Sequence, residues 1–291
     1  MSQRIVGVIG GSGLYELEGL ENVEEIDMDT PFGKPSDAII SGTLGDVRML
    51  FIPRHGRGHR FTPSEVPYLA NIWALKKLGA QWCISVSAVG SLRKKVVPGH
   101  VVIVDQFIDR TKGIRPSTFF GHGIVGHVAF GDPVSPVLAK VLYKAAKKAG
   151  ATVHKGGTYV CMEGPQFSTR AESELYRSWG ARVIGMTNIP EAKLAREAEI
   201  AYATVALATD YDCWHPDHDD VSVDQVVATV NKNAALAKEI IAIAAGMIPD
   251  ELDPLVDGAC KYAVMTRPEL LPEEQKKALD PLFGKYWGNP S

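Results

Sequence analysis

Two aspartates one residue apart, Asp210 and Asp212, follow an apolar run that begins near Ile200 and is rich in Ala and Val. In an extended chain, side chains at i and i+2 point to the same side of the strand. The run therefore predicts two carboxylates emerging together at the carboxyl end of a buried strand, where α/β proteins place ligand sites. One carboxylate can accept a hydrogen bond from the exocyclic amine of a heterocycle while the other moves a proton to a ring nitrogen. A helix cap beside a solvated turn acid is the alternative that this pattern leaves open.

The loop 54–60 is a second group of residues capable of chemistry, and it follows the apolar run 49–53. Most of its residues are basic or can become so: Arg54, His55, Arg57, His59 and Arg60. A guanidinium offers a planar fork to an oxyanion, and the glycines between these residues allow a close approach. His55 and His59 are four residues apart, but no helix or nearby acid accompanies them, so we expect no metal. A solvated basic loop is the alternative.

Small and hydroxyl-bearing residues end further apolar runs. Gly10-Gly11-Ser12-Gly13 can present backbone amides and the Ser12 hydroxyl to a phosphate, although it lacks the GxGxxG and P-loop spacings. Ser87 and Thr187 follow two other runs and can supply donors. For the glycine-rich segment the alternative is a plain tight turn. For Ser87 it is close packing of small residues, and for Thr187 it is a helix cap. Because the carboxyl ends of parallel strands meet at one edge of a sheet, these groups together predict an anion site beside a carboxylate pair.

The composition is that of an ordinary globular protein with a sizeable core, since 45% of its 291 residues are hydrophobic and 22% are charged. The net charge of −3 and the absence of long basic runs argue against a nucleic-acid or anionic-membrane surface. The apolar stretch 5–9 is too short for a signal peptide or a spanning helix, so we expect a cytoplasmic protein. Four scattered cysteines without CxxC spacing predict neither a zinc site nor a disulfide framework.

Apolar runs of strand length alternate with amphipathic stretches, and several of the runs lack a polar alternation. Such runs are typical of a parallel sheet that is covered on both faces. We therefore expect a single α/β domain over residues 1–291, with a central, mostly parallel twisted β-sheet flanked by helices. The expected strands are 4–9, 47–52, 82–88, 100–104, 158–162, 182–186 and 201–209. The expected helices are 64–78, 134–149, 169–178, 190–199 and 222–245.

Three stretches of the chain are distinctive. Apolar residues recur at spacings of three and four through 222–245, which is typical of one buried helix face. The segment 105–133 has several glycines and little periodicity, so it is interpreted as a long excursion, and such loops are usually functional. The segment 247–291 is charged and punctuated by prolines, which favours a peripheral C-terminal extension that docks on a neighbouring subunit.

Taken together in order, the motifs resemble those of the trimeric purine nucleoside phosphorylases, a family with a phosphorylase/hydrolase-like fold. The resemblance extends from about residue 4 to residue 245, and the tail after 246 matches poorly. The blocks that carry it are Gly10-Gly11-Ser12-Gly13, Asp29-Thr30-Pro31-Phe32-Gly33, Arg54-His55-Gly56, Asn71-Ile72-Trp73-Ala74-Leu75, Asp105-Gln106-Phe107-Ile108-Asp109-Arg110, Glu163-Gly164-Pro165 and Thr209-Asp210-Tyr211-Asp212-Cys213-Trp214.

The resemblance assigns roles to individual residues. It implies that phosphate is held by Ser12, Arg54, His55, Ser87, the backbone at Ala88, and Thr187. It implies that Met186 lines the ribose and Phe167 the base, while Asp210 protonates N7 of the leaving purine with support from Asp212. Relatives that prefer 6-oxopurines carry asparagine at the position of Asp210 and glutamate at that of Ser168, so this chain has the 6-amino pattern. The 5' end of the nucleoside is expected to meet His59, Val223 and Val226, with His127 from an adjacent subunit of a homotrimer.

The expected activity is the reversible phosphorolysis of 5'-methylthioadenosine to adenine and 5-methylthioribose 1-phosphate, in purine and methionine salvage. Inorganic phosphate would be a co-substrate, and neither cofactor nor metal is expected. The expected assembly is a homotrimer or a dimer of trimers. One alternative is a phosphorylase that prefers adenosine or 6-oxopurine nucleosides. Others are a nucleosidase that uses water and a non-catalytic nucleotide-binding module.

Overall fold

The computed structural model describes residues 3–11, 13–216 and 223–287, with the side chains of 223–232 left out. Within these residues, eleven strands form one sheet. The strands are β1 (Arg4–Gly10), β2 (Glu21–Ile26), β3 (Ile39–Leu44), β4 (Val47–Pro53), β5 (Trp82–Ser91), β6 (Val101–Ile103), β7 (Gln106–Arg110), β8 (Val153–Lys155), β9 (Thr158–Met162), β10 (Val183–Gly185) and β11 (Ala201–Asp210). The helices are α1 (Tyr68–Lys77), α2 (Pro136–Lys148), α3 (Arg170–Ser178), α4 (Asn188–Glu197), α5 (Val223–Ala245), α6 (Glu273–Ala278) and α7 (Asp280–Phe283), with 3₁₀ turns at Pro268–Leu270 and Gly284–Tyr286.

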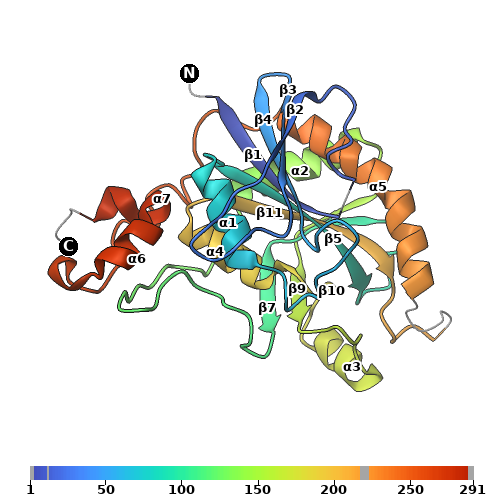
Figure 1. Cartoon of the computed structure of the whole chain (residues 1–291). Coiled ribbons are helices and arrows are strands. Elements are labelled where there is room, and N and C mark those ends of the chain that lie inside the picture. The colour runs from blue at the N-terminus through green and yellow to red at the C-terminus, as the bar shows by residue number, and fades with distance from the viewer. Residues whose placement is uncertain (1–2, 12, 217–222, 288–291) are drawn as a thin grey trace.

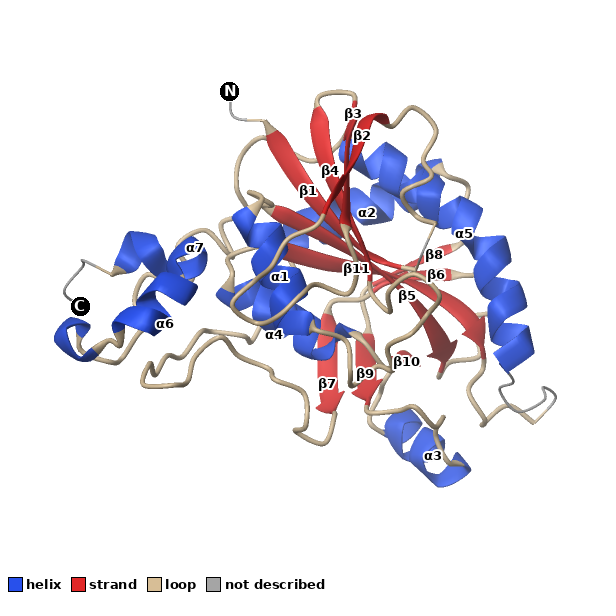
Figure 2. Cartoon of the chain, viewed as in Figure 1, coloured by secondary structure: helices blue, strands red, loops and turns tan. Residues whose placement is uncertain are grey.

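Strand β5 lies at the centre of the sheet (Figure 2). It pairs in parallel with β1 on one side and with β11 on the other, and β1 pairs in parallel with β4. At its carboxyl end β5 also pairs with β10 in an antiparallel way, through Gly90 and Ser91. The carboxyl ends of β1, β4, β5 and β11 therefore meet at one edge of the sheet. The predicted α/β fold with a central, mostly parallel sheet flanked by helices is confirmed.

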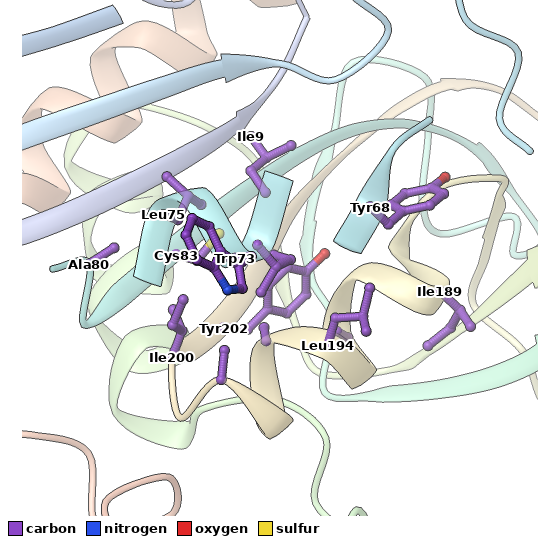
Figure 3. Packing of buried hydrophobic residues seen from close by; sticks show 14 of the residues in the cluster. Ile9, Tyr68, Trp73, Leu75, Ala80, Cys83, Ile189, Leu194, Ile200 and Tyr202 are labelled. Atoms are coloured by element: carbon purple, nitrogen blue, oxygen red, sulfur yellow. The ribbon is translucent and has the colours of Figure 1, made fainter. Parts of the chain in front are cut away.

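Helices cover both faces of the sheet, with α1 and α4 on one face and α2 and α5 on the other (Figure 1). Alternate side chains of the buried strands point to opposite faces. On β5, for example, Cys83 packs with the α1 and α4 side, and Ile84 with the α2 and α5 side. Figure 3 shows the hydrophobic cluster on the α1 and α4 side, in which Trp73 of α1 and Leu194 of α4 lie against the strands. Both faces are thus buried, which explains the continuous apolar runs in the sequence.

Each expected strand and helix has a counterpart in the structure, whereas β2, β3, β7 and β8 were not expected. Strand β2 contains three glutamates and is exposed, so it carries no apolar signal. Strand β7 lies inside the segment 105–133, which therefore is not wholly an excursion but adds a strand beside β9. The remainder of that segment consists of loop and isolated bridges.

The C-terminal segment lies at the periphery of the molecule in Figure 1, yet it contributes to the core of its own chain. The side chains of Leu279, Leu282 and Phe283 are buried in the cluster that contains α1 and α4. Trp73 Nε1 donates a hydrogen bond to the carbonyl oxygen of Ala278 at 2.8 Å. The segment thus covers the outer side of α1. That the whole chain forms one domain remains a prediction.

None of the described helices combines the length and the apolar character that crossing a membrane requires.

Candidate functional site

Arg54 follows β4 directly and is buried at the edge where the strands end, with 3% of its surface exposed. Its Nε and Nη2 atoms donate to the two carboxylate oxygens of Glu191 at 2.8 and 2.9 Å. Nη2 also donates to Ser85 Oγ at 2.8 Å, and Nη1 to the carbonyl oxygen of Val86 at 2.9 Å. Burial opposes the charge of Arg54, but the Glu191 carboxylate outweighs it and raises the pKa of the guanidinium.

The planar fork of Arg54 is therefore occupied by a carboxylate of this chain, and a two-pronged grip on phosphate through Nε and Nη2 is excluded. Nη1 bears two N–H groups. One of them reaches Val86, and the other has no partner among the described residues. The predicted role of Arg54 in anion binding thus depends on one N–H group. The fork geometry that sequence reasoning expected for the anion is wrong, because Glu191 was not recognised.

His55 is partly buried beside Arg54, and its Nδ1 atom lies 2.8 Å from the carbonyl oxygen of Phe61. Since a carbonyl oxygen only accepts, Nδ1 carries a proton. Burial and the Arg54 charge lower the pKa of His55 to about 4, so the ring is neutral at neutral pH and Nε2 is an acceptor. His59, in a left-handed conformation with φ 55°, stacks on this ring with 4.3 Å between centroids. A neutral His55 can accept a hydrogen bond from a protonated phosphate oxygen.

Hydroxyl groups from β5 and from the start of α4 come together at the same edge. Ser87 Oγ lies 3.5 Å from Thr187 Oγ1 and 3.3 Å from the hydroxyl of Tyr159, and all three side chains are buried. Gly185 makes room for that phenol, because a Cβ at Gly185 would lie 2.0 Å from the Tyr159 hydroxyl oxygen. Ala88, the next residue of β5, is exposed. Ser12 lies outside the described residues, so its predicted phosphate contact stays a prediction.

Asp210 ends β11, and its carboxylate is held by two short local hydrogen bonds. Thr209 Oγ1 donates to Oδ2 at 2.6 Å, and the backbone N–H of Asp212 donates to Oδ1 at 2.7 Å. Asp212 is not part of the strand, because it has a φ of 52° in the turn that follows. The expectation that strand alternation aligns the two carboxylates is therefore wrong. The turn brings them together instead, and both lie against Gly90, where a Cβ would be 2.9 Å from Asp210 Oδ1 and 3.4 Å from Asp212 Cβ.

Both aspartates hold their protons more tightly than exposed acids do. Burial raises the pKa of Asp210, although Thr209 and the backbone of Asp212 oppose the shift. Burial raises the pKa of Asp212 to about 6, with a further contribution from the charge of Asp210. Asp212 Oδ2 is buried without a hydrogen-bond partner among the described residues, although the nearby Ser173 hydroxyl lowers the pKa of this carboxyl. Carboxyl groups with raised pKa values at the end of a strand are suited to proton transfer.

Of the residues expected near the base and the ribose, Ser168 lies beside this pair. The carbonyl oxygen of Ser168 accepts a hydrogen bond from Cys213 Sγ at 3.3 Å, which places Ser168 beside the turn of Asp212. Met186 packs against Gly164, where a Cβ would lie 2.5 Å from the sulfur. The side chain of Phe167 is 44% exposed, which leaves its ring accessible to a ligand.

The contacts expected at the 5' end of the nucleoside are not tested by the described residues. His127 is exposed and its backbone N–H donates to the carbonyl oxygen of Ala263 at 2.9 Å, beside the C-terminal segment. Val223 and Val226 belong to α5, but their side chains lie outside the described part. The predicted contacts of His59, His127, Val223 and Val226 with a nucleoside therefore stay predictions.

Sequence reasoning missed a second buried ion pair beside the site. Arg115, from the segment 105–133, donates through Nε to Glu163 Oε1 at 2.7 Å and through Nη1 to the Met186 carbonyl oxygen at 2.6 Å. It also donates to the Ile189 carbonyl oxygen at 3.0 Å. Arg115 therefore forms hydrogen bonds with the backbone on both sides of Thr187. Periodicity could not reveal this arginine because it lies in a loop, although Glu163 belongs to one of the recognised motif blocks.

Among the described residues, no three His, Cys, Asp or Glu side chains lie together as ligands for a metal ion.

Residues 5–245 match the model of a family described as the phosphorylase superfamily. The chain belongs to that superfamily. It is 60% identical to the S-methyl-5'-thioadenosine phosphorylase of Geobacter sulfurreducens, over 98% of this chain and 99% of the relative. It is 55% identical to the enzyme of that name from Chloroflexus aurantiacus, over 99% of this chain and the whole relative. These alignments include most of the tail after residue 246, whereas the match to the family model ends at residue 245.

Solved structures agree with this membership. A methylthioadenosine phosphorylase from an Antarctic soil metagenomic library has a TM-score of 0.91 and 49% identity, covering 97% of this chain and 99% of that chain. The methylthioadenosine phosphorylase of Schistosoma mansoni in complex with adenine has a TM-score of 0.81 and 36% identity, covering 88% of this chain and 98% of that chain.

Proposed function

We propose that this protein catalyses the reversible phosphorolysis of 5'-methylthioadenosine to adenine and 5-methylthioribose 1-phosphate, in purine and methionine salvage. Relatives with 50–60% identity over nearly their full length carry the name of that activity. The observation that carries the proposal is the pair formed by the partly buried Asp210 and the buried Asp212 at the same sheet edge as the Ser87 and Thr187 hydroxyls. In this proposal the two carboxylates bind the purine, and the two hydroxyls bind the anion.

The reaction requires few steps from the protein. An oxygen of phosphate forms a bond to C1' as the bond between C1' and N9 breaks, and the bonding electrons pass to the purine. Asp210 donates its proton to N7, which neutralises the leaving adenine, and Asp212 supports it. The negative charge of phosphate stabilises the cationic character of the sugar. The proposed phosphate site consists of Ser12, Arg54, His55, Ser87, Ala88 and Thr187. No cofactor is proposed.

The proposal also covers the remaining substrate contacts, the assembly and the cellular location of the protein. Phe167, Ser168 and Met186 would contact the base and the ribose, and His59, Val223 and Val226 the methylthio group. We propose a homotrimer or a dimer of trimers in which His127 of a neighbouring subunit completes the 5' pocket, and a cytoplasmic location. Light scattering on a sizing column measures the assembly directly, and a monomeric mass would contradict it.

The experiment that tests the function is adenine release from 5'-methylthioadenosine with and without added phosphate. Release that requires phosphate is expected. Release without phosphate would indicate a nucleosidase, and no release would contradict the proposal. Adenosine and inosine serve as comparison substrates, because a preference for either would favour a different purine nucleoside phosphorylase.

The role of Asp210 is tested by Asp210→Asn. An amide cannot deliver the proton, so turnover of 5'-methylthioadenosine should fall by about 10²–10⁴-fold, the usual value of general acid catalysis. Initial rates at saturating phosphate measure the effect, and thermal unfolding verifies that the variant is folded. Unchanged adenine release by the folded variant would remove Asp210 from this role.

A further inference from the structure

A closed ring of five buried side chains includes the guanidinium of Arg54. Each member contacts the next, in the order Arg54, Ser85, Asn188, Tyr202 and Glu191. The members come from the end of β4, from β5, from the start of α4 and from β11. Apart from Arg54, which is 3% exposed, each is exposed by 2% or less. The ring therefore ties one cation to three strands and a helix.

The directions of the hydrogen bonds follow from the chemistry of the members. Glu191 binds the Arg54 fork as a carboxylate, so the Tyr202 hydroxyl must donate to Glu191 Oε1, at 2.8 Å. The oxygen of Tyr202 then accepts from Asn188 Nδ2, which also donates to Ser85 Oγ at 3.1 Å. Ser85 Oγ in turn accepts from Arg54 Nη2. Asn188 Nδ2 also donates to Thr204 Oγ1 at 2.9 Å. Because Arg54 can only donate and the Glu191 carboxylate can only accept, the bonds to Glu191 and Ser85 give the guanidinium a defined orientation.

Folding stability alone does not account for this arrangement. Removing a cation and a carboxylate from water costs about as much as their attraction returns, and apolar side chains of similar volume often serve a core equally well. The Tyr202 ring already packs among such side chains (Figure 3). What the ring of hydrogen bonds supplies in addition is orientation, since its members hold three N–H groups of Arg54 and the Val86 carbonyl oxygen holds a fourth.

The same ring also positions the start of α4. Asn188 immediately follows Thr187, whose hydroxyl lies 3.5 Å from Ser87 Oγ. Arg54 and Thr187 therefore cannot shift independently of each other. A displacement of Tyr202 or Asn188 would move the remaining Nη1 N–H group of Arg54 relative to both hydroxyls.

We propose that Asn188, Glu191 and Tyr202 are positioning residues for the anion, which hold Arg54 so that its remaining Nη1 N–H group faces phosphate beside Ser87 and Thr187. This inference rests on the proposed function, because it assumes that the anion is the co-substrate phosphate. The charge of Glu191 balances that of Arg54, and His55 is neutral, so the anion is held mainly by directed donors. Orientation should then affect phosphate more than the nucleoside.

The test is Tyr202→Phe, which removes the hydroxyl and retains the ring. Loss of a hydrogen bond to a charged group should raise the KM for phosphate by about tenfold and leave the KM for 5'-methylthioadenosine within about twofold. The matched control is Tyr286→Phe, because the Tyr286 hydroxyl also donates to a buried glutamate, Glu199 Oε1, at 2.7 Å. Tyr286 belongs to the C-terminal segment, so its variant should lose stability without a change in the KM for phosphate.

A second variant covers the case in which Tyr202→Phe does not fold. Ser85→Ala removes the acceptor shared by Arg54 and Asn188 and should raise the KM for phosphate in the same way. If both variants fold, the double variant should show less than the product of the two single effects, because they break one ring.

Calorimetric titration of the variants with inorganic phosphate separates the two proposals, since it needs no turnover. Weaker phosphate binding in Tyr202→Phe or Ser85→Ala, with wild-type binding in Tyr286→Phe, supports positioning. Equal phosphate binding and KM in every variant, with only the unfolding temperature lowered, would overturn it. Wild-type protein that releases no adenine would instead overturn the proposed function.

Discussion

The two ends of α4 carry acids that bind very different partners. At the first turn, Glu191 pairs with Arg54 at the sheet edge, among side chains of the candidate site. At the other end, Glu197 accepts from the hydroxyl of Thr118 and the backbone N–H of Phe119, in the segment 105–133. Glu199, just beyond the helix, accepts from the backbone N–H of Cys260 in the C-terminal segment. One end of α4 therefore orients the site, and the other fastens two segments outside the sheet.

The helix dipole distinguishes the two ends as well. An anion is stabilised at the amino end of a helix and destabilised at the carboxyl end. Glu191 has the favourable position and an arginine partner, whereas Glu197 ends the helix. Burial raises the pKa of Glu197 to about 7, and the dipole acts in the same direction. The difference teaches that the same residue type forms a buried ion pair at one end of the helix and has a raised pKa at the other.

The largest expected effect comes from removing Glu191, the ion-pair partner of Arg54. Glu191→Ala leaves the Arg54 guanidinium buried without its partner, which should lower the free energy of unfolding by about 3–5 kcal/mol. Urea unfolding followed by circular dichroism measures this loss. A loss below about 1 kcal/mol would show that the pair contributes little to stability, which would contradict the contrast drawn between the two ends of α4.

A smaller effect is expected at the other end. Glu199→Gln weakens the bonds to Cys260 and Tyr286 and removes the ion pair with Lys285, so stability should fall by about 2 kcal/mol. The KM values for both substrates should stay at the wild-type level. The matched control is Glu16→Gln, which removes an exposed pair with Lys238 and should cost at most about 1 kcal/mol. A raised KM for phosphate in Glu199→Gln would mean that the two ends are not separate.

These two ends differ in how far the sequence predicts them. The start of α4 follows from Thr187, Asn188 and Pro190, which carry helix-start signals. From the sequence, Glu191 resembles an ordinary first-turn acid. Its partner Arg54 is 137 residues away in the chain, and nothing local indicates the pairing. Apolar periodicity located the sheet and its helices because burial leaves a regular pattern. It could not locate polar pairs, whose partners are chosen by the fold rather than by spacing.

The aspartates give a second instance of the same limit. Their spacing predicted that both carboxylates lie at the end of β11, and they do. The predicted cause was strand alternation, whereas the actual cause is the left-handed turn at Asp212, closed by its N–H bond to Asp210. A motif thus located the group correctly while its geometry depended on one backbone angle.

The smallest expected effect is a change in pH dependence at the carboxyl end of α4. The raised pKa of Glu197 means that the folded protein binds more protons than the unfolded chain between about pH 4.5 and 7. The stability from this group is therefore fully present below pH 4.5 and is lost as the pH rises through 7. Glu197→Gln does not titrate, so its unfolding free energy should change less between pH 5 and 7, by on the order of 1 kcal/mol.

Chemical unfolding at several pH values measures this slope, with Glu172→Gln as the control. Hydrogen bonds to the Thr169 backbone and hydroxyl lower the pKa of Glu172, so it stays ionised above pH 5 and its variant should keep the wild-type slope. Equal slopes in wild type and Glu197→Gln would mean that Glu197 stays ionised across this pH range. The carboxyl end of α4 would then contribute no pH dependence through this group.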